Sequence, residues 1–275
     1  IIFIVKREVK SREFLILDVI MKTICVFNQK GGVGKTTTNI NICSYLAMAG
    51  YKVLAIDIDP QGNTTSGLGI NKMKLEKSMY NLLTENQDIE SIIVKSELVD
   101  NLYIVPAMMN LAGAEIDLIG LEDRESILKN QLDKVKDKYD YILIDCPPSL
   151  GMLTINALVS SDTVLIPMQS EFYALEGVGQ LIDTINRIKK SLNKCLEIEG
   201  VIMTMYDTRT NLSNEVYKEV ENYFKDKLYK TTIPRNIRLA EAPSFGLPIV
   251  LYDDKCKGAE AYENLTNEFL KRQGV

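Results

Sequence analysis

A glycine-rich loop between a predicted strand and a predicted helix carries the residues best suited to chemistry, and it reads QKGGVGKTT over residues 29–37. Glycines let successive backbone N–H groups turn toward phosphate oxygens without a Cβ clash, and the helix that follows adds its positive end. We expect Lys35 to reach the β and γ phosphates, and the hydroxyl of Thr36 to bind a Mg²⁺ ion that bridges them. The segment predicts a nucleotide site lined by Lys30, Gly31, Gly32, Val33, Gly34, Lys35, Thr36 and Thr37.

Two apolar stretches end in carboxylates that suit a magnesium nucleotide. In AIDIDP, residues 55–60, strand periodicity places Asp57 and Asp59 on one face at the carboxyl end of a strand. We expect Asp59 to position an attacking water, and Asp57 to belong to the switch region that senses the γ phosphate. In YILIDCPPS, residues 141–149, the strand ends in Asp145, which we expect to hold the magnesium ion or its water.

The elements that must position these groups follow an α/β pattern. From residue 21 on, short apolar runs alternate with amphipathic helical stretches, which is typical of a largely parallel sheet with helices on both faces. Gly50 is suited to end the first helix, and the Gly-, Thr- and Asn-rich stretch from Pro60 to Gly69 follows a strand where α/β folds bind ligands. We expect strands near residues 23–28, 52–57, 102–105, 141–145, 163–167, 198–205 and 228–232, and helices near 35–49, 122–138, 174–191, 213–227 and 258–272.

Composition indicates a globular protein and removes several kinds of chemistry. The chain has 275 residues, 46% of them hydrophobic, and a formal charge of −5, so a polyanion could bind only at a local patch. It holds no histidine, which excludes a Ser-His-Asp triad, a Cys-His pair and histidine metal sites. Five scattered cysteines without a CxxC pair favour reduced thiols and a cytoplasmic protein. No window approaches the roughly 18 apolar residues that a membrane span needs.

The first twenty residues read differently from the rest. They resemble a secretory signal only weakly, because their apolar part is short and contains Asp18. Met21 opens the first convincing strand, so we expect one domain over residues 21–275. We interpret residues 1–20 as an N-terminal extension that is non-native or disordered, and an extra edge strand or helix is the alternative.

The phosphate loop also departs from the ordinary GxxxxGK[ST] pattern, because Gln29 takes the place of the first glycine and Lys30 adds a second lysine. KGGVGKT resembles the deviant Walker A motif of the ParA/MinD group of P-loop ATPases, in which the extra lysine reaches the nucleotide of a facing subunit. Within that group the chain is most similar to the chromosome-partitioning ParA/Soj ATPases. The segments that carry this resemblance are DPQGN (59–63), LAGAE (111–115), CPPSL (146–150), LTINA (153–157), YALEG (173–177) and IPRNIRLAEAPS (233–244).

The resemblance implies a single-domain P-loop NTPase fold and an ATPase that uses ATP and Mg²⁺. It implies a switch that dimerises with two nucleotides between the subunits, binds DNA without sequence preference and associates with the nucleoid. A ParB-type partner bound at centromere-like DNA would stimulate hydrolysis. By the same resemblance Lys30, Lys35 and Asp59 are catalytic, Pro234 and Arg235 lie near adenine, and Arg209 and Arg238 contact DNA.

Several alternatives remain at this point. Arg209 and Arg238 could be plain surface charges, and Tyr206 could be core filler rather than a neighbour of adenine. The alternative function is a MinD-like membrane-surface ATPase that regulates division-site placement, which would need a basic amphipathic helix at the C-terminus. Residues 263–272 read ENLTNEFLKR, which is too acidic for that role. A nitrogenase iron protein would need cysteines placed to bridge an iron–sulfur cluster, and the scattered thiols show no such framework.

Overall fold

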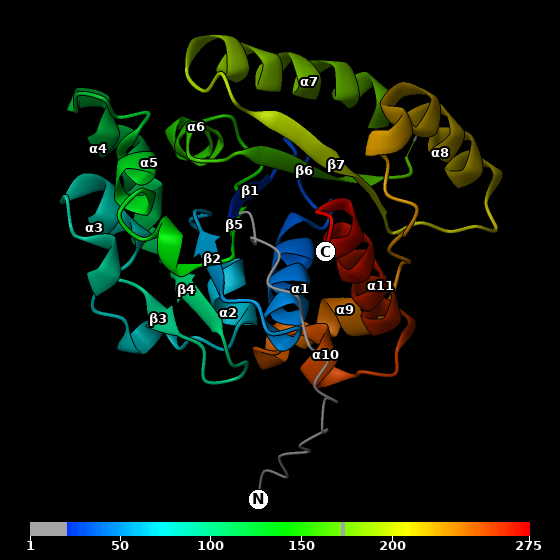
Figure 1. Cartoon of the computed structure of the whole chain (residues 1–275), viewed down its shortest axis with the longest axis horizontal. Coiled ribbons are helices and arrows are strands. Elements are labelled where there is room, and N and C mark those ends of the chain that lie inside the picture. The colour runs from blue at the N-terminus through cyan, green and yellow to red at the C-terminus, as the bar shows by residue number, and fades with distance from the viewer. Residues whose placement is uncertain (1–20, 172–173) are drawn as a thin grey trace, which may run out of the picture.

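Seven strands form one sheet in the computed structural model, which describes residues 21–171 and 174–275 (Figure 1). The strand order is β3-β4-β2-β5-β1-β6-β7, and every neighbouring pair is parallel except β3 with β4. The carboxyl ends of the central strands therefore meet at one edge of the sheet. The strands are β1 (Lys22–Val26), β2 (Val53–Asp57), β3 (Val94–Lys95), β4 (Leu102–Val105), β5 (Tyr141–Asp145), β6 (Thr163–Gln169) and β7 (Glu197–Thr204).

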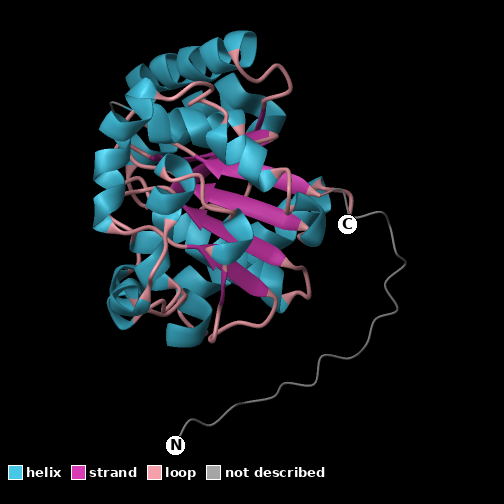
Figure 2. Ribbon diagram, turned by 90° about the vertical axis from the view of Figure 1, so that its left-hand side faces the viewer, coloured by secondary structure: helices cyan, strands magenta, loops and turns pink. Residues whose placement is uncertain are grey.

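Helices cover both faces of this sheet (Figure 2). Because successive side chains of a strand point to opposite faces, the buried apolar residues separate into two core layers. The helices are α1 (Lys35–Met48), α2 (Asn63–Gly67), α3 (Met79–Thr84), α4 (Ala114–Asp117), α5 (Ile127–Leu132), α6 (Met152–Val159), α7 (Ala174–Ser191), α8 (Asn211–Phe224), α9 (Ile237–Glu241), α10 (Ile249–Tyr252) and α11 (Lys257–Arg272).

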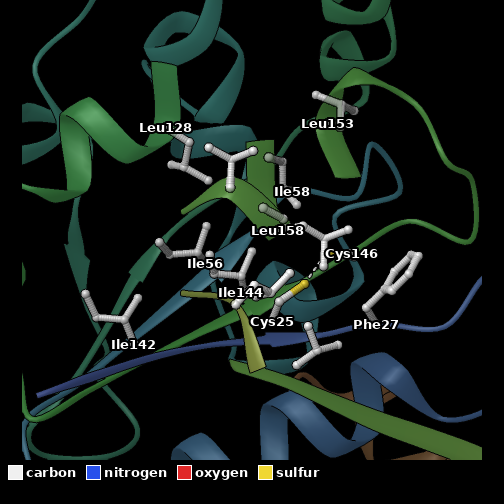
Figure 3. Packing of buried hydrophobic residues seen from close by; sticks show 14 of the residues in the cluster. Cys25, Phe27, Ile56, Ile58, Leu128, Ile142, Ile144, Cys146, Leu153 and Leu158 are labelled. Carbon is white, nitrogen blue, oxygen red and sulfur yellow. Dashed lines mark hydrogen bonds between the residues drawn. The ribbon is translucent and has the colours of Figure 1, made fainter. Parts of the chain in front are cut away.

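One core layer lies between the sheet and the helices α3 to α8. Cys25 of β1, Ile56 of β2 and Ile144 of β5 belong to it, together with Leu153 of α6. Figure 3 shows Cys25 and Cys146 pointing toward one another within this layer, and their sulfur atoms lie 3.2 Å apart. The strands that carry the predicted site thus pack against α6 on this face.

The other core layer lies between the sheet and α1, α9 and α11. Tyr262 and Phe269 of α11 share it with Leu46 of α1. The contact is also polar, since the hydroxyl groups of Tyr262 and Thr38 lie 3.1 Å apart and the hydroxyl of Tyr45 donates to the carbonyl of Ala259. The helix that follows the glycine-rich loop is therefore covered by α11.

The structure confirms the predicted α/β class and most of the predicted elements, but two predictions were wrong. Residues 228–232 form no strand. Their link to β7 is one isolated bridge, in which Tyr229 donates its N–H to the carbonyl of Val201, and Glu268 accepts the backbone N–H groups of Lys230 and Thr231. The predicted helix over 122–138 shrinks to α5 and a short 3₁₀ turn (Lys136–Lys138). The side chain of Asn156, in α6, binds the backbone carbonyl of Arg124 and the backbone N–H of Leu128, and these contacts replace helical hydrogen bonds.

Several short elements of the described chain were not predicted, namely α2, α3, α4, α6, α9, α10 and β3. Helices α3 and α6 form where no helix was expected, and α2 forms within the Pro60 to Gly69 stretch that was expected to bind ligands. The two-residue strand β3 is too short to show any periodicity. The predicted extension over residues 1–20 lies outside the described residues, as does Tyr173.

Two glycines bring the turn after α2 into backbone contact with the turn before α10. Gly69 and Gly246 both have positive φ angles, +77° and +66°. A Cβ atom on Gly246 would lie 3.3 Å from the Cα of Gly69 and 3.3 Å from the carbonyl oxygen of Ser66. Glycine is needed at position 246 both for the left-handed conformation and for this close approach.

We expect Gly246→Ala to lower the free energy of unfolding by about 2–3 kcal/mol, because it adds crowding to the strain of a left-handed alanine. Gly50 is the matched control, since its φ of +101° is positive but a Cβ there would meet nothing within 4 Å. Gly50→Ala should cost only about 1 kcal/mol. Denaturant unfolding of both variants measures the difference, and equal losses would contradict the importance of the contact.

Candidate nucleotide-binding site

The glycine-rich loop leads from β1 directly into the N-terminus of α1. Gly34 caps this helix with φ 88° and ψ 22°, and no side chain forms a capping hydrogen bond. The first turn contains no acidic residue. The N–H groups at the start of a helix have no partner within it and lie at its positive end, so an uncapped start of this kind favours an anion.

Side chains that the sequence reasoning missed shape the loop. The amide of Asn28 donates to the carbonyl of Pro167 at 2.9 Å, and its oxygen accepts the backbone N–H of Lys30 at 3.0 Å. Gln169 donates to the carbonyl of Gly32 at 2.7 Å. Thr204, at the end of β7, donates to the carbonyl of Val33 at 2.8 Å. The sequence could have indicated these residues, because Asn28, Gln169 and Thr204 are all polar and lie at or just after the carboxyl ends of apolar strands.

The two lysines of the loop are placed differently. Lys35 is only 6% exposed, and its Nζ donates to the carbonyl of Lys30 at 3.1 Å. Burial lowers the pKa of Lys35, although the nearby carboxylates of Asp145 and Asp59 oppose the shift. Lys30 lies at the surface, where its Nζ is 2.5 Å from Oε2 of Glu171 and both side chains are about half exposed. Lys35 therefore points into the site, while Lys30 is free to exchange its partner at little cost.

The predicted carboxylates lie together where β2 and β5 end side by side. Asp57 and Asp145 are opposite one another in the register of these strands, and both are fully buried. Helix α2 is tied to both. Thr65 donates its backbone N–H and its hydroxyl to Oδ2 of Asp57, each at 2.7 Å, and Thr64 donates its hydroxyl to Oδ2 of Asp145 at 2.8 Å. Asp59 accepts the backbone N–H of Gln61 at 2.9 Å.

Burial of two like charges favours the neutral forms of both Asp57 and Asp145. Burial, with the charge of Asp57 as a second cause, raises the pKa of Asp145 to about 8, although the hydroxyls of Thr64 and Thr36 oppose this shift. Burial also raises the pKa of Asp57 to about 6, against the opposing hydrogen bonds from Thr65. The site therefore favours a bound cation at neutral pH, because a cation would compensate the second negative charge.

The residues at this position fit a magnesium ion that is held jointly with a nucleotide. Oδ1 of Asp145 is buried and accepts no hydrogen bond from the described residues. Within residues 21–171 and 174–275, no three Cys, Asp or Glu side chains converge on one point. Mg²⁺ commonly takes one or two protein ligands together with phosphate oxygens, and Thr36 and Asp145 would supply that share.

A groove lies between the segment that follows β7 and helix α11. It has a volume of about 780 Å³, and Tyr206, Arg209, Pro234 and Arg235 all line it. Its other wall is formed by α11, through Lys257, Glu260, Ala261 and Asn264. The structure thus brings together Pro234 and Arg235, which were predicted to lie near adenine, and Arg209, which was predicted to contact DNA.

The two arginines predicted to contact DNA both form ion pairs at the surface. Arg209 is paired with Asp207 at 2.7 Å. Arg238 does not line the groove; it lies in α9 and contacts Glu241 at 2.9 Å and Asp253 at 3.4 Å. All of these pairs are solvent-exposed, so they contribute little to stability.

Comparison with known proteins places this geometry in a family. A family model described as an AAA domain matches residues 21–198. The sporulation initiation inhibitor protein Soj of Bacillus subtilis is 56% identical over 247 residues, which cover 90% of this chain and 97% of that protein. The chromosome-partitioning ATPase Soj of Treponema pallidum is 51% identical and covers 92% of this chain and 98% of its own length. The chain belongs to the Soj/ParA family of chromosome-partitioning ATPases.

Solved structures support the same family and its fold. A cobyrinic acid a,c-diamide synthase from Mycobacterium smegmatis, with bound ADP and magnesium, matches with a TM-score of 0.80 and 35% identity over 93% of this chain and 96% of its own. A plasmid partition protein from Borrelia burgdorferi, bound to AMPPNP, matches with a TM-score of 0.76 and 32% identity over 91% and 99%. The predicted Soj/ParA family, the P-loop fold and the ATPase class are confirmed. No helix in the described part of the chain is long and apolar enough to cross a membrane.

The buried Asp145 predicts a pH-dependent stability of the protein without nucleotide. Its pKa is 3.8 before folding effects and about 8 in the fold, so between these pH values the folded state holds a proton that the unfolded chain has released. The free energy of unfolding should then fall as the pH rises through this window. In Asp145→Asn the side chain keeps the shape of aspartate but does not titrate. The stability of this variant relative to the original protein should increase by roughly 3–4 kcal/mol between pH 5 and pH 8.

Denaturant unfolding at both pH values, without nucleotide or Mg²⁺, measures this change. Each protein at pH 5 serves as its own control. A stability difference between the two proteins that does not depend on pH would contradict the assignment of the raised pKa to Asp145.

Proposed function

We propose that this chain is an ATP-driven switch for partitioning chromosomes or plasmids. It binds ATP and Mg²⁺, forms a homodimer with the nucleotides between the subunits, and then binds double-stranded DNA without sequence preference. A ParB-type protein at centromere-like DNA stimulates hydrolysis and releases it. The supporting observation is the uncapped start of α1, together with the buried amine of Lys35 and the buried Asp57–Asp145 pair.

Different residues of the site bind the phosphates, hold Mg²⁺ and position the attacking water. The loop N–H groups and Lys35 hold the β and γ phosphates, where a positive charge counts most because the site is buried. Thr36 and Asp145 hold Mg²⁺, which when bound neutralises charge on the same phosphates. Asp59 orients the attacking water, and it lies two residues beyond β2 on the segment that leads into α2.

The switch is the segment from Asp57 to α2. Thr64 and Thr65, both fully buried, attach α2 to the two carboxylates that respond to the ligand. A change in charge or position at Asp145 therefore acts on α2 through one hydrogen bond. Through Gly69 and Gly246 the same segment touches the turn that follows α9, where Arg238 lies.

Lys30 is the residue proposed to act between subunits. Its exposed position and its weak pairing with Glu171 allow it to leave that carboxylate for the phosphates of a facing nucleotide. Phosphate oxygens carry more charge than one carboxylate, so the exchange is favourable when ATP is present on the partner.

The membrane-surface alternative has less support. The apolar residues of α11, among them Tyr262, Leu265 and Phe269, are buried against the body of the protein. An interfacial helix must present such residues to lipid. The protein is accordingly proposed to be cytoplasmic, and to be associated with the nucleoid when ATP is bound.

We expect Asp59→Ala to bind ATP normally and to form stable dimers, but to hydrolyse ATP roughly a hundredfold more slowly because the group that positions water is missing. Lys30→Ala combined with Asp59→Ala should bind ATP and remain monomeric. Light scattering with ATP reports the dimer, and calorimetry reports the affinity.

Lys35→Ala is the control for nucleotide binding, and it should bind no ATP because the phosphates then face only backbone dipoles and the metal. If Asp59→Ala binds ATP but stays monomeric at micromolar concentration, the sandwich dimer is wrong. Normal ATP affinity of Lys35→Ala would instead rule out the assigned phosphate site.

The DNA-binding surface is proposed to include Arg209 and Arg238. Both must leave exposed carboxylates to reach phosphates, and this exchange is favourable only when several contacts form together. From residue 180 to 275 the chain has 15 basic and 14 acidic residues, so no general excess of positive charge assists them. A dimer doubles the number of arginines, and DNA binding should therefore require ATP.

Arg209→Ala and Arg238→Ala should each weaken DNA binding while leaving the ATP-dependent dimer intact. Each change removes two phosphate contacts per dimer, so the slope of log affinity against log salt should fall by about 2. Electrophoretic shifts of two unrelated duplexes at several salt concentrations measure this slope. Arg187→Ala, at an exposed arginine of α7, is the matched control and should bind normally. Equal DNA affinity of the nucleotide-free monomer and the ATP-bound dimer would refute the proposal.

A further inference from the structure

The N-terminus of α6 is capped by a side chain from a distant helix. Helix α6 has no side-chain cap of its own and no acidic residue in its first turn. Glu115 of α4 takes this place, since its Oε2 accepts the backbone N–H of Met152 at 2.7 Å and its Oε1 accepts that of Leu153 at 3.4 Å. A carboxylate in this position satisfies the unpaired N–H groups and complements the positive end of the helix.

Gly151 makes room for this carboxylate. Its backbone angles are φ −109° and ψ −169°, which any residue adopts easily, so its conformation does not require glycine. Space does require it, because a Cβ atom at residue 151 would lie 2.2 Å from Oε1 of Glu115. Glu115 and Gly151 therefore fit one another, although 36 positions separate them in the sequence.

The capped helix fixes one end of the loop that borders the phosphate site. This loop, residues 146–151, begins immediately after Asp145 and ends at Gly151. Pro148 lies against the phosphate loop, since a Cβ on Gly31 would be 3.9 Å from the Cβ of Pro148. Thr154, in the first turn of α6, donates its hydroxyl to the carbonyl of Ser149 at 2.6 Å. The position of α6 therefore helps to set the position of Pro148 and Ser149 beside Gly31.

We propose that Glu115 is a positioning residue for ATP hydrolysis. By holding the start of α6, it keeps residues 146–151 against the phosphate loop, on the exposed side where the second subunit would approach. This inference rests on the proposed ATPase dimer. Glu115 touches neither the loop N–H groups nor Lys35, so its loss leaves ATP binding intact and disturbs the geometry needed for turnover.

The test is a double-mutant cycle between Glu115 and Gly151, read out by turnover and by ATP affinity. Glu115→Ala should lower kcat roughly tenfold and leave the Kd for ATP within about twofold, because misplacement acts on the reacting geometry. Gly151→Ala should do the same by displacing the carboxylate. The double variant should be no worse than Glu115→Ala alone, since the three atoms nearest to the added Cβ all belong to the Glu115 carboxylate and are then absent.

Two further variants separate positioning from general stability. Glu115→Gln keeps an oxygen that can accept one of the two hydrogen bonds, so it should restore part of the lost turnover. Asp117→Asn is the matched control on the same helix, because the carboxylate of Asp117 accepts the hydroxyl of Tyr80 rather than an N–H group of α6. It should leave turnover unchanged.

Three results would overturn the inference. These are normal turnover of Glu115→Ala, a loss of ATP affinity equal to the loss of turnover, or additive effects in the double variant. Failure of the proposed function can be distinguished from failure of this inference, because the original protein would then bind no ATP or would hydrolyse none. Thermal unfolding of each variant confirms that the proteins compared are folded at the assay temperature.

Discussion

Buried charge at the carboxyl edge of the sheet is the constraint on which the rest of the structure depends. The start of α1 and the ends of β2 and β5 carry Lys35, Asp57 and Asp145 into a region from which water is largely removed. Charges in such a region are tolerated only when neighbouring groups compensate them. Parallel strands allow this arrangement because they end at one edge, so residues far apart in sequence share one small volume. Buried polar groups need hydrogen-bond partners in the same way. Thr64 and Thr65 of α2 provide them for the two carboxylates, and the amide of Gln169 provides one for the carbonyl of Gly32.

The sequence allowed prediction of the groups whose types have few other uses. A GGVGKT loop between a strand and a helix, and carboxylates at the ends of apolar strands, point to a phosphate site without knowledge of tertiary contacts. The polar residues that shape the loop were missed because their role depends on which strands become neighbours. Asn28 acts through β6, for example, and nothing in the order of residues places β6 beside β1.

The errors in secondary structure have a similar origin. The periodicity of residues 122–138 favours a helix, but Asn156 takes the backbone groups that this helix would need. Residues 228–232 are apolar enough for a strand, yet Glu268 occupies the N–H groups that would form the ladder. In both places a single side chain from a later segment outweighs local preference, and side-chain contacts of this range cannot be read from a local pattern.

The packing of α11 against α1 sets an order of events during synthesis. The phosphate loop leaves the ribosome more than 200 residues before α11 does, and at roughly 5–20 residues per second this delay is about ten to forty seconds. Throughout that time the part of α1 that packs against α11 is uncovered, because Tyr262 and Phe269 have not yet been translated. The nascent chain thus exposes this apolar surface of α1 to chaperones until α11 has been translated.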